Sequence, residues 1–95
     1  QMLLMGIDGQ SITQTTCNLI KRLSPGGIIY RGSNANNPKQ LSQLSDALQE
    51  CSSTNGGLPL FIAIDHEGQY VTRFNSDVTI FPSAMAQGAT AKPQY

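Results

Sequence analysis

The sequence predicts an α/β fold built on a short parallel sheet. Three apolar runs, at residues 2–7, 27–30 and 58–64, alternate with two segments whose apolar residues recur at helical spacing. Within each run the hydrophobic residues are continuous rather than alternating, which is typical of strands buried on both faces. The order strand, helix, strand, helix, strand is that of βαβ units, in which neighbouring strands run parallel.

The first helix is predicted between the first two apolar runs, where Ile12, Leu19, Ile20 and Leu23 recur at helical spacing. Its N-cap has two candidates. Ser11 has Gln14 three residues later, as in a capping box, and Thr13 is the alternative. The sequence Pro25-Gly26-Gly27 then ends the helix and leads into the second strand.

The second helix is predicted from Asn37, which suits an N-cap, followed by Pro38 in the first turn. Leu41, Leu44, Leu48 and Cys51 then fall on one helical face. A loop over residues 52–57 leads into the third strand, which ends abruptly at Asp65. After a break at Phe81-Pro82, a further helix is predicted to open over residues 84–89.

Length and charge exclude several classes of protein. A chain of 95 residues and 10.2 kDa forms one small domain but cannot form a whole (β/α)8 barrel. Six basic and six acidic residues balance to a net charge of +0 without a basic stripe, which argues against nucleic acid or an anionic membrane as a partner. No apolar stretch approaches the ~20 residues of a membrane span.

The two cysteines are predicted to be free thiols. Cys17 and Cys51 lie 34 positions apart, both on predicted helices, and form no Cys-x-x-Cys pair. With a single histidine, His66, they cannot build a zinc knuckle or a redox motif. We therefore expect two buried or half-buried thiols rather than a disulfide, and neither a metal nor a cofactor.

Three charged residues stand where the predicted strands end. In parallel α/β folds functional groups collect at the carboxyl ends of strands, which makes Asp8, Arg31 and Asp65 candidates for a site. Charged residues also follow strands simply because loops are hydrated. For Asp8 and Arg31 we favour this structural interpretation.

The ten residues from Ile64 to Arg73 contain the chain's highest density of functional side chains. They include two carboxylates, a histidine and an arginine, together with Gly68. The Arg73 guanidinium offers a planar set of donors and the Asp65 carboxylate a pair of acceptors, which suits binding to the adjacent hydroxyls of a sugar. An Asp65–Arg73 salt bridge that merely ties the loop is the alternative, and the residues alone favour it.

This segment resembles a known signature. Residues 61–73, with Asp65, Glu67, Gly68, Val71 and Arg73, resemble the Asp-x-Glu-Gly-Gly-Arg-Val-x-Arg motif of the glycoside hydrolase family 3 N-terminal barrel, in its β-N-acetylhexosaminidase branch. Collinear matches lie at residues 1–9, at Gly26-Gly27 ahead of Asn34, and at residues 38–41 and 81–90. Gln69, Tyr70 and Ser33 depart from the family pattern.

The resemblance implies that residues 1–95 are the N-terminal part, about three βα units, of a TIM-type (β/α)8 barrel and part of a catalytic domain. It implies a retaining exo-glycosidase that removes terminal β-linked N-acetylglucosamine from peptidoglycan or chitin-derived saccharides. Asp65 and Arg73 match substrate-binding residues of the −1 subsite, whereas His66 stands outside the site.

The resemblance implies that no catalytic residue of the family falls within this chain. The nucleophile and the acid/base histidine match barrel segments beyond residue 95, so the chain alone is expected to be inactive. Because Gln1 lies inside an apolar run, the true beginning is expected upstream. The bacterial cytoplasm and the cell envelope both remain open as locations.

Two alternatives remain. One is a β-glucosidase of the same fold, against which Glu67 and Arg73 argue, because that branch usually lacks an Asp-x-Glu-Gly loop with this arginine. The other is a non-catalytic fragment that binds sugar or takes part in assembly.

Overall fold

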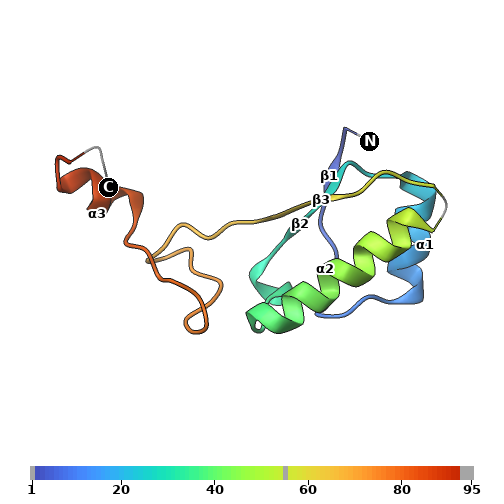
Figure 1. The fold of residues 1–95 in the computed structure, drawn as a ribbon, viewed down its shortest axis with the longest axis horizontal. Helices are drawn as coiled ribbons and strands as arrows, with labels where there is room; N and C mark the ends of the chain where they lie inside the picture. Colours follow the sequence, from blue (N-terminus) through green and yellow to red (C-terminus); the bar gives the residue numbers. More distant parts are fainter. Residues whose placement is uncertain (1, 55, 93–95) are drawn as a thin grey trace.

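A parallel sheet of three strands, with two helices against it, forms the larger part of the molecule (Figure 1). The computed structural model describes residues 2–54 and 56–92. Gln1, Asn55 in the predicted loop and the chain end at Tyr95 lie outside the described residues.

The strands are β1 (Leu4–Met5), β2 (Gly27–Tyr30) and β3 (Phe61–Ile64), in the order β1-β2-β3. Both pairings are parallel, with Gly27 of β2 beside Leu4 on one side and Phe61 on the other. The predicted parallel sheet is therefore confirmed, and β2 has the predicted bounds.

The outer strands are shorter than predicted because their ends bond to side chains of other elements instead of to the sheet. Before β3, Pro59 has no N–H to donate. Leu60 donates its N–H to Gln49 Oε1 (2.9 Å) and accepts from Gln49 Nε2 (2.8 Å). After β1, the carbonyl of Ile7 accepts from the side chain of Asn34 (3.1 Å).

Helix α1 (Gln14–Leu23) connects β1 to β2, and its start decides between the two predicted caps. The hydroxyl of Thr13 accepts the backbone N–H of Thr16 at 3.1 Å, so Thr13 is the N-cap. Lys21 and Arg22 occupy the last turn, where positive charge interacts favourably with the negative end of the helix dipole.

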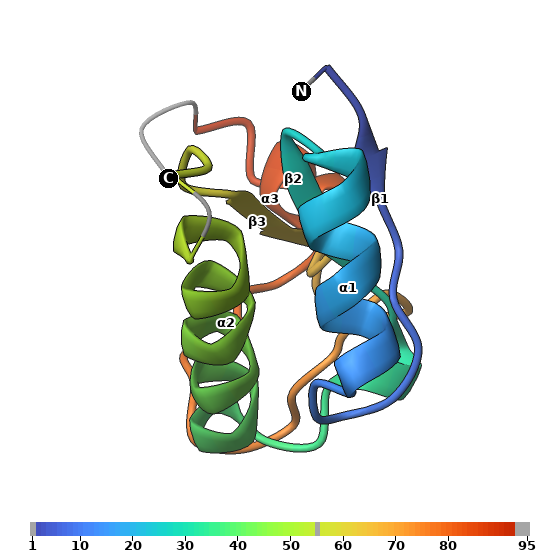
Figure 2. The same cartoon turned by 90° about the vertical axis from the view of Figure 1, so that its right-hand side faces the viewer.

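Helix α2 (Pro38–Ser53) connects β2 to β3 and begins as predicted, with the Asn37 side chain accepting the N–H of Gln40 at 2.9 Å. Its predicted apolar face is buried against the sheet and α1. Figure 2 shows the two helices side by side on the same side of the sheet. The core consists of Ile7, Ile20, Ile28, Tyr30, Leu41, Leu44, Leu48 and Leu60.

The sheet is covered on one face only, which corrects the expectation of strands buried on both faces. Ile28 and Tyr30 point to the helices and are 0% and 1% exposed. On the other face, Leu4 and Phe61 are 57% and 80% exposed. A continuous apolar run indicates that both faces of a strand are covered in the complete fold. It does not indicate which segment of the chain covers each face.

The cysteine prediction is wrong, because Cys17 and Cys51 form a disulfide and leave no free cysteine. The two residues face each other across the contact between α1 and α2, with their Cα atoms 5.5 Å apart, within the range that a disulfide spans. Spacing along the chain did not reveal that these two helix faces meet.

Residues 65–92 extend away from the helix-covered sheet and end in α3 (Ala84–Ala89), which has the predicted bounds (Figure 1). The molecule measures 49 × 26 × 16 Å. Its Cα radius of gyration is 15.9 Å, whereas a compact domain of this length has about 12 Å. Most of this arm is therefore not folded back onto the core, although Phe74 packs against it.

Candidate substrate-binding site

The loop after β3 folds back on itself and brings Arg73 to Asp65. Glu67 donates its N–H to the carbonyl of Val71 at 2.7 Å, and Gly68 and Val71 form an antiparallel bridge. Gly68 has a φ of 75°, a conformation that glycine adopts without strain. The turn predicted at Gly68 is present.

Asp65 and Arg73 form an ion pair, in which Nη2 of the guanidinium donates to Oδ2 of the carboxylate. The side chains of Arg73 and Asp65 are 25% and 42% exposed, so the pair is open to a ligand. The hydrogen bond from Arg73 holds the pKa of Asp65 below its ordinary value, although partial desolvation opposes it. Asp65 is therefore a carboxylate at neutral pH.

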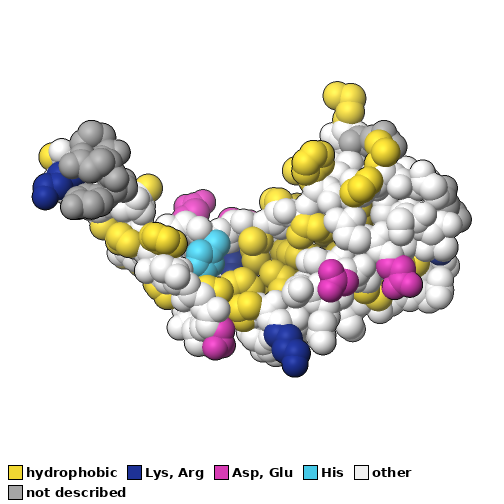
Figure 3. Space-filling model, viewed as in Figure 1, with side chains coloured by type: hydrophobic (Ala, Val, Ile, Leu, Met, Phe, Trp, Pro, Cys, Tyr) yellow, Lys and Arg dark blue, Asp and Glu magenta, His cyan; other side chains and the backbone are white. Residues whose placement is uncertain are grey.

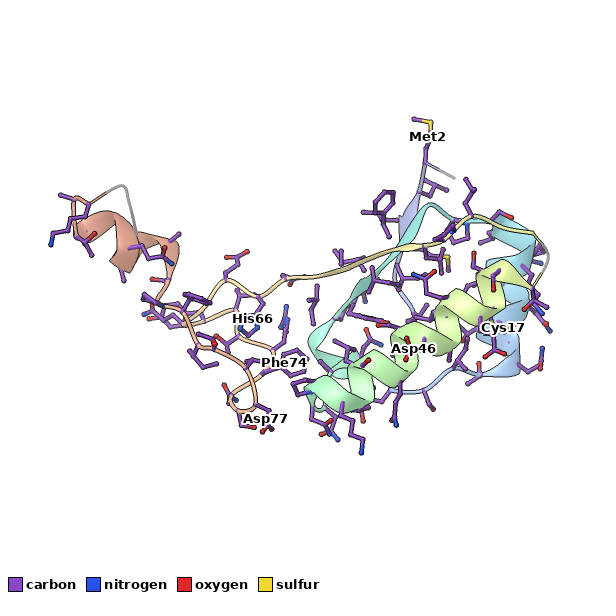
Figure 4. All side chains as sticks on the ribbon, viewed as in Figure 1. Met2, Cys17, Asp46, His66, Phe74 and Asp77 are labelled. Atoms are coloured by element: carbon purple, nitrogen blue, oxygen red, sulfur yellow. A yellow bond between two sulfur atoms is a disulfide. The ribbon has the colours of Figure 1, made fainter. Side chains whose placement is uncertain are left out.

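His66 supports the backbone of this loop. Its Nδ1 accepts the N–H of Arg73 at 3.1 Å, and its ring lies 6.2 Å from the ring of Phe74 (Figure 4). This contact is made with the backbone of the loop itself, and the expectation that His66 stands outside the site stays a prediction. Figure 3 shows hydrophobic side chains gathered between this histidine and the helix-covered part of the molecule.

Asn34 joins the loops that follow β1 and β2, and it is the one fully buried polar side chain among residues 2–54 and 56–92. Its Nδ2 donates to the carbonyls of Ile7 (3.1 Å) and Gly9 (2.7 Å), while its Oδ1 accepts the N–H of Arg31 (2.8 Å). Every polar atom of the side chain is thus used to hold two loops at the carboxyl edge of the sheet.

The other two charged candidates do not join the Asp65–Arg73 pair. Asp8 and Arg31 follow β1 and β2 as predicted, and neither forms an ion pair with any residue that the structure describes. Both side chains are exposed. The structural interpretation of these two residues stays a prediction.

A hollow between the 67–71 turn and residues 83–87 is lined by Glu67, Tyr70 and Met85 among others. Neither Asp65 nor Arg73 lines it, so it is separate from the ion pair. Within the described ranges 2–54 and 56–92, no group of three or more metal-ligating side chains is found. No helix in these ranges has the length and hydropathy needed to cross a membrane.

Sequence reasoning named Asp65 and Arg73, whose role in binding stays a prediction, but missed the structural role of Asn34. The run 32–37 reads as a polar, turn-rich loop, and nothing in its composition marks one asparagine as buried. The one available signal was the match of Asn34 to the family pattern, which carried no role.

Comparison with known proteins identifies the family. Residues 1–95 match the profile of the glycosyl hydrolase family 3 N-terminal domain. The chain belongs to this family. Glycosyl hydrolase family 3 relatives include beta-hexosaminidase A of Pseudoalteromonas piscicida, 42% identical over 78 residues. Another is a beta-hexosaminidase of Alkalilimnicola ehrlichii, 33% identical over 81 residues.

Solved structures of the same family support the fold. A family 3 beta-N-acetylglucosaminidase from Paenibacillus sp. str. FPU-7 superposes with a TM-score of 0.87 at 36% identity, covering 96% of this chain and 17% of that one. NagZ from Neisseria gonorrhoeae, solved with N-trifluoroacetyl-D-glucosamine, gives 0.80 at 26% identity, covering 97% and 26%. The fold is therefore the N-terminal part of a TIM-type (β/α)8 barrel.

The chain spans only a small share of its relatives. The aligned segments cover 80% and 85% of this chain but 13% of the Pseudoalteromonas protein and 22% of the Alkalilimnicola protein. The likeness therefore concerns one part of those enzymes.

Proposed function

We propose that residues 1–95 are part of the catalytic domain of a retaining exo-glycosidase. This enzyme removes terminal β-linked N-acetylglucosamine from peptidoglycan or chitin-derived saccharides. The relatives named beta-hexosaminidase and beta-N-acetylglucosaminidase support this activity. In this proposal Asp65 and Arg73 bind hydroxyls of the sugar in the −1 subsite.

The observation that carries the proposal is the part-exposed Asp65–Arg73 pair at the carboxyl end of β3. In TIM-type barrels this edge of the sheet is where active sites lie. The pair places a fixed acceptor next to a fixed donor, and two neighbouring sugar hydroxyls offer the complementary set. Because the ion pair orients both groups before the sugar arrives, little side-chain freedom is lost on binding.

The residues of this chain bind and orient the sugar, and they do not carry out its chemistry. Asp65 would accept a hydrogen bond from one hydroxyl, and Arg73 would donate to the oxygen of another. His66 would keep the backbone of Arg73 in place. The nucleophile and the acid/base group of a retaining mechanism would come from other segments of the complete enzyme.

The test uses the complete protein that contains this chain. We expect it to release 4-nitrophenol from 4-nitrophenyl N-acetyl-β-glucosaminide and to act far more slowly on the matching β-glucoside. A preference for the glucoside would replace the proposal with the β-glucosidase alternative. Sugar binding without turnover of either compound would support the non-catalytic alternative instead.

A further inference from the structure

The guanidinium of Arg73 lies directly against the backbone of Gly32, in the loop that follows β2. A Cβ atom added at Gly32 would lie 3.1 Å from Nη1 of Arg73 and 3.8 Å from its Cδ and Cζ. A separation of 3.1 Å is closer than ordinary van der Waals contact between such atoms. A side chain at this position would therefore press on the end of the guanidinium.

Gly32 is held in place by its surroundings. It opens the short 3-10 turn Gly32–Asn34, in which its carbonyl accepts the N–H of Ala35 at 3.3 Å. The turn is fixed by the buried side chain of Asn34, which bonds to the loop after β1. The backbone at Gly32 therefore has little freedom to move away from Arg73.

Arg73 is held by residues of its own loop. Its Nη2 bonds to Asp65 and its backbone N–H to His66. Its Nε is buried and has no hydrogen-bond partner within residues 2–54 and 56–92. A side chain at position 32 would therefore displace the guanidinium relative to the Asp65 carboxylate.

We propose that Gly32 is a positioning residue, whose missing side chain sets where the Arg73 guanidinium lies beside Asp65 and how it meets the sugar. The inference rests on the proposed function, because it assigns Gly32 to the same sugar-binding site. Gly32 acts through Arg73 and touches no substrate itself.

The chain offers a matched control at Gly6, just after β1. A Cβ added there would also meet a guanidinium, that of Arg31, but at 3.7 Å from Nε, which is ordinary contact. Gly6→Ala and Gly32→Ala thus add the same methyl group next to an arginine at the same edge of the sheet. They differ in whether the arginine must move.

The experiment measures KM, kcat and melting temperature of the complete enzyme with 4-nitrophenyl N-acetyl-β-glucosaminide. We expect Gly32→Ala to raise KM about fivefold or more, the scale of a weakened hydrogen bond to a charged group. Gly6→Ala should leave KM within about twofold, and both variants should melt close to the unsubstituted enzyme. An unchanged KM in Gly32→Ala, or an equal rise in Gly6→Ala, overturns the proposal.

A double-mutant cycle tests whether the effect passes through Arg73. With Arg73→Ala already present, Gly32→Ala should change KM by less than about twofold, because the guanidinium that it displaces is absent. The same rise in both backgrounds would show that Gly32 acts otherwise and would overturn the proposal. If the unsubstituted enzyme has no such activity, the proposed function fails first. A crystal structure of Gly32→Ala then still tests the Gly32–Arg73 contact, and a guanidinium that keeps its place beside Asp65 rejects that contact separately.

Discussion

The ion pair between Asp65 and Arg73 uses one carboxylate oxygen and one guanidinium nitrogen, so each group keeps further capacity for hydrogen bonds. An exposed ion pair contributes little to stability, because water screens it and two long side chains must be ordered. The pair is therefore better suited to presenting polar atoms to a ligand than to holding the loop.

Substitution of the pair separates binding from stability. Asp65→Ala and Arg73→Ala in the complete enzyme should each lower kcat/KM at least about tenfold, since a hydrogen bond from a charged group is worth roughly 1.5–3 kcal/mol. Kinetics and thermal melting of both variants are the measurements. A clear loss of melting temperature with unchanged kcat/KM in both would assign the pair a structural role only.

The pH dependence of stability should report the same pair. The folded-state pKa of Asp65 lies below its unfolded value, so the small stabilisation that the pair gives is complete above about pH 4. Its contribution is lost as the pH falls through the lower folded-state pKa. The melting temperatures of the enzyme and of Asp65→Asn should therefore differ by a constant amount from pH 7 to 5 and converge in stronger acid. Asp46→Asn, which removes an exposed carboxylate outside any described ion pair, is the control for the loss of one negative charge.

Residue types and spacing were enough to predict the Asp65–Arg73 pair, because both partners and the turn at Gly68 lie within one short loop. The parts played by Asn34 and Gly32 depend on contacts with residues far away in the chain. Asn34 bonds to Gly9 across 25 positions, and Gly32 meets Arg73. Such contacts leave no local pattern.

At the scale of elements, local signals predicted helix ends better than strand ends. Thr13 and Asn37 cap their helices by bonds to residues three positions later, which the sequence displays directly. A strand ends where its neighbour stops bonding to it. The side chains of Gln49 and Asn34 bond to the backbone at one end of β3 and of β1, where the sheet pairing stops. The disulfide between α1 and α2 was missed for the same reason, since it reports which helix faces meet.

The disulfide should contribute measurably to stability. Closing a loop of 34 residues corresponds to about 3–4 kcal/mol in the chain-entropy account. A reductant should therefore lower the melting temperature of the complete enzyme, and the double variant Cys17→Ala/Cys51→Ala should melt at the same lower temperature with or without reductant. Two titratable thiols in the unreduced, unfolded protein would contradict the bond.

At the scale of the whole molecule, one face of the sheet and an extended arm are uncovered. Leu4 and Phe61 expose apolar surface on that face, and Met2 and Met85 are almost fully exposed. Uncovered surface of this kind is typical of an unfilled interface. In the barrel of the solved relatives, other strands and helices would lie there.

The isolated 95-residue chain should accordingly be poorly folded or self-associated. Light scattering and amide resonances of the purified chain provide the measurement. A monomer with a cooperative thermal transition and well-dispersed resonances would contradict the interpretation as part of a barrel. A longer chain that supplies the remaining barrel segments is the control and should be soluble as a defined species.

The same isolated chain should be catalytically silent. It holds the proposed sugar-binding pair but no residue that matches the nucleophile or the acid/base group of the family. Release of 4-nitrophenol from the N-acetyl-β-glucosaminide, in proportion to the concentration of the purified chain, would show that catalysis resides here after all.

The bond between Cys17 and Cys51 also limits where the protein can mature. Forming it removes two electrons and two protons from a pair of thiols, and the glutathione and thioredoxin of the cytosol work against that reaction. The bond is therefore expected to form and persist in an oxidising compartment. A preparation made in a reducing cytosol would lack the tie between α1 and α2, and its stability would understate that of the native protein.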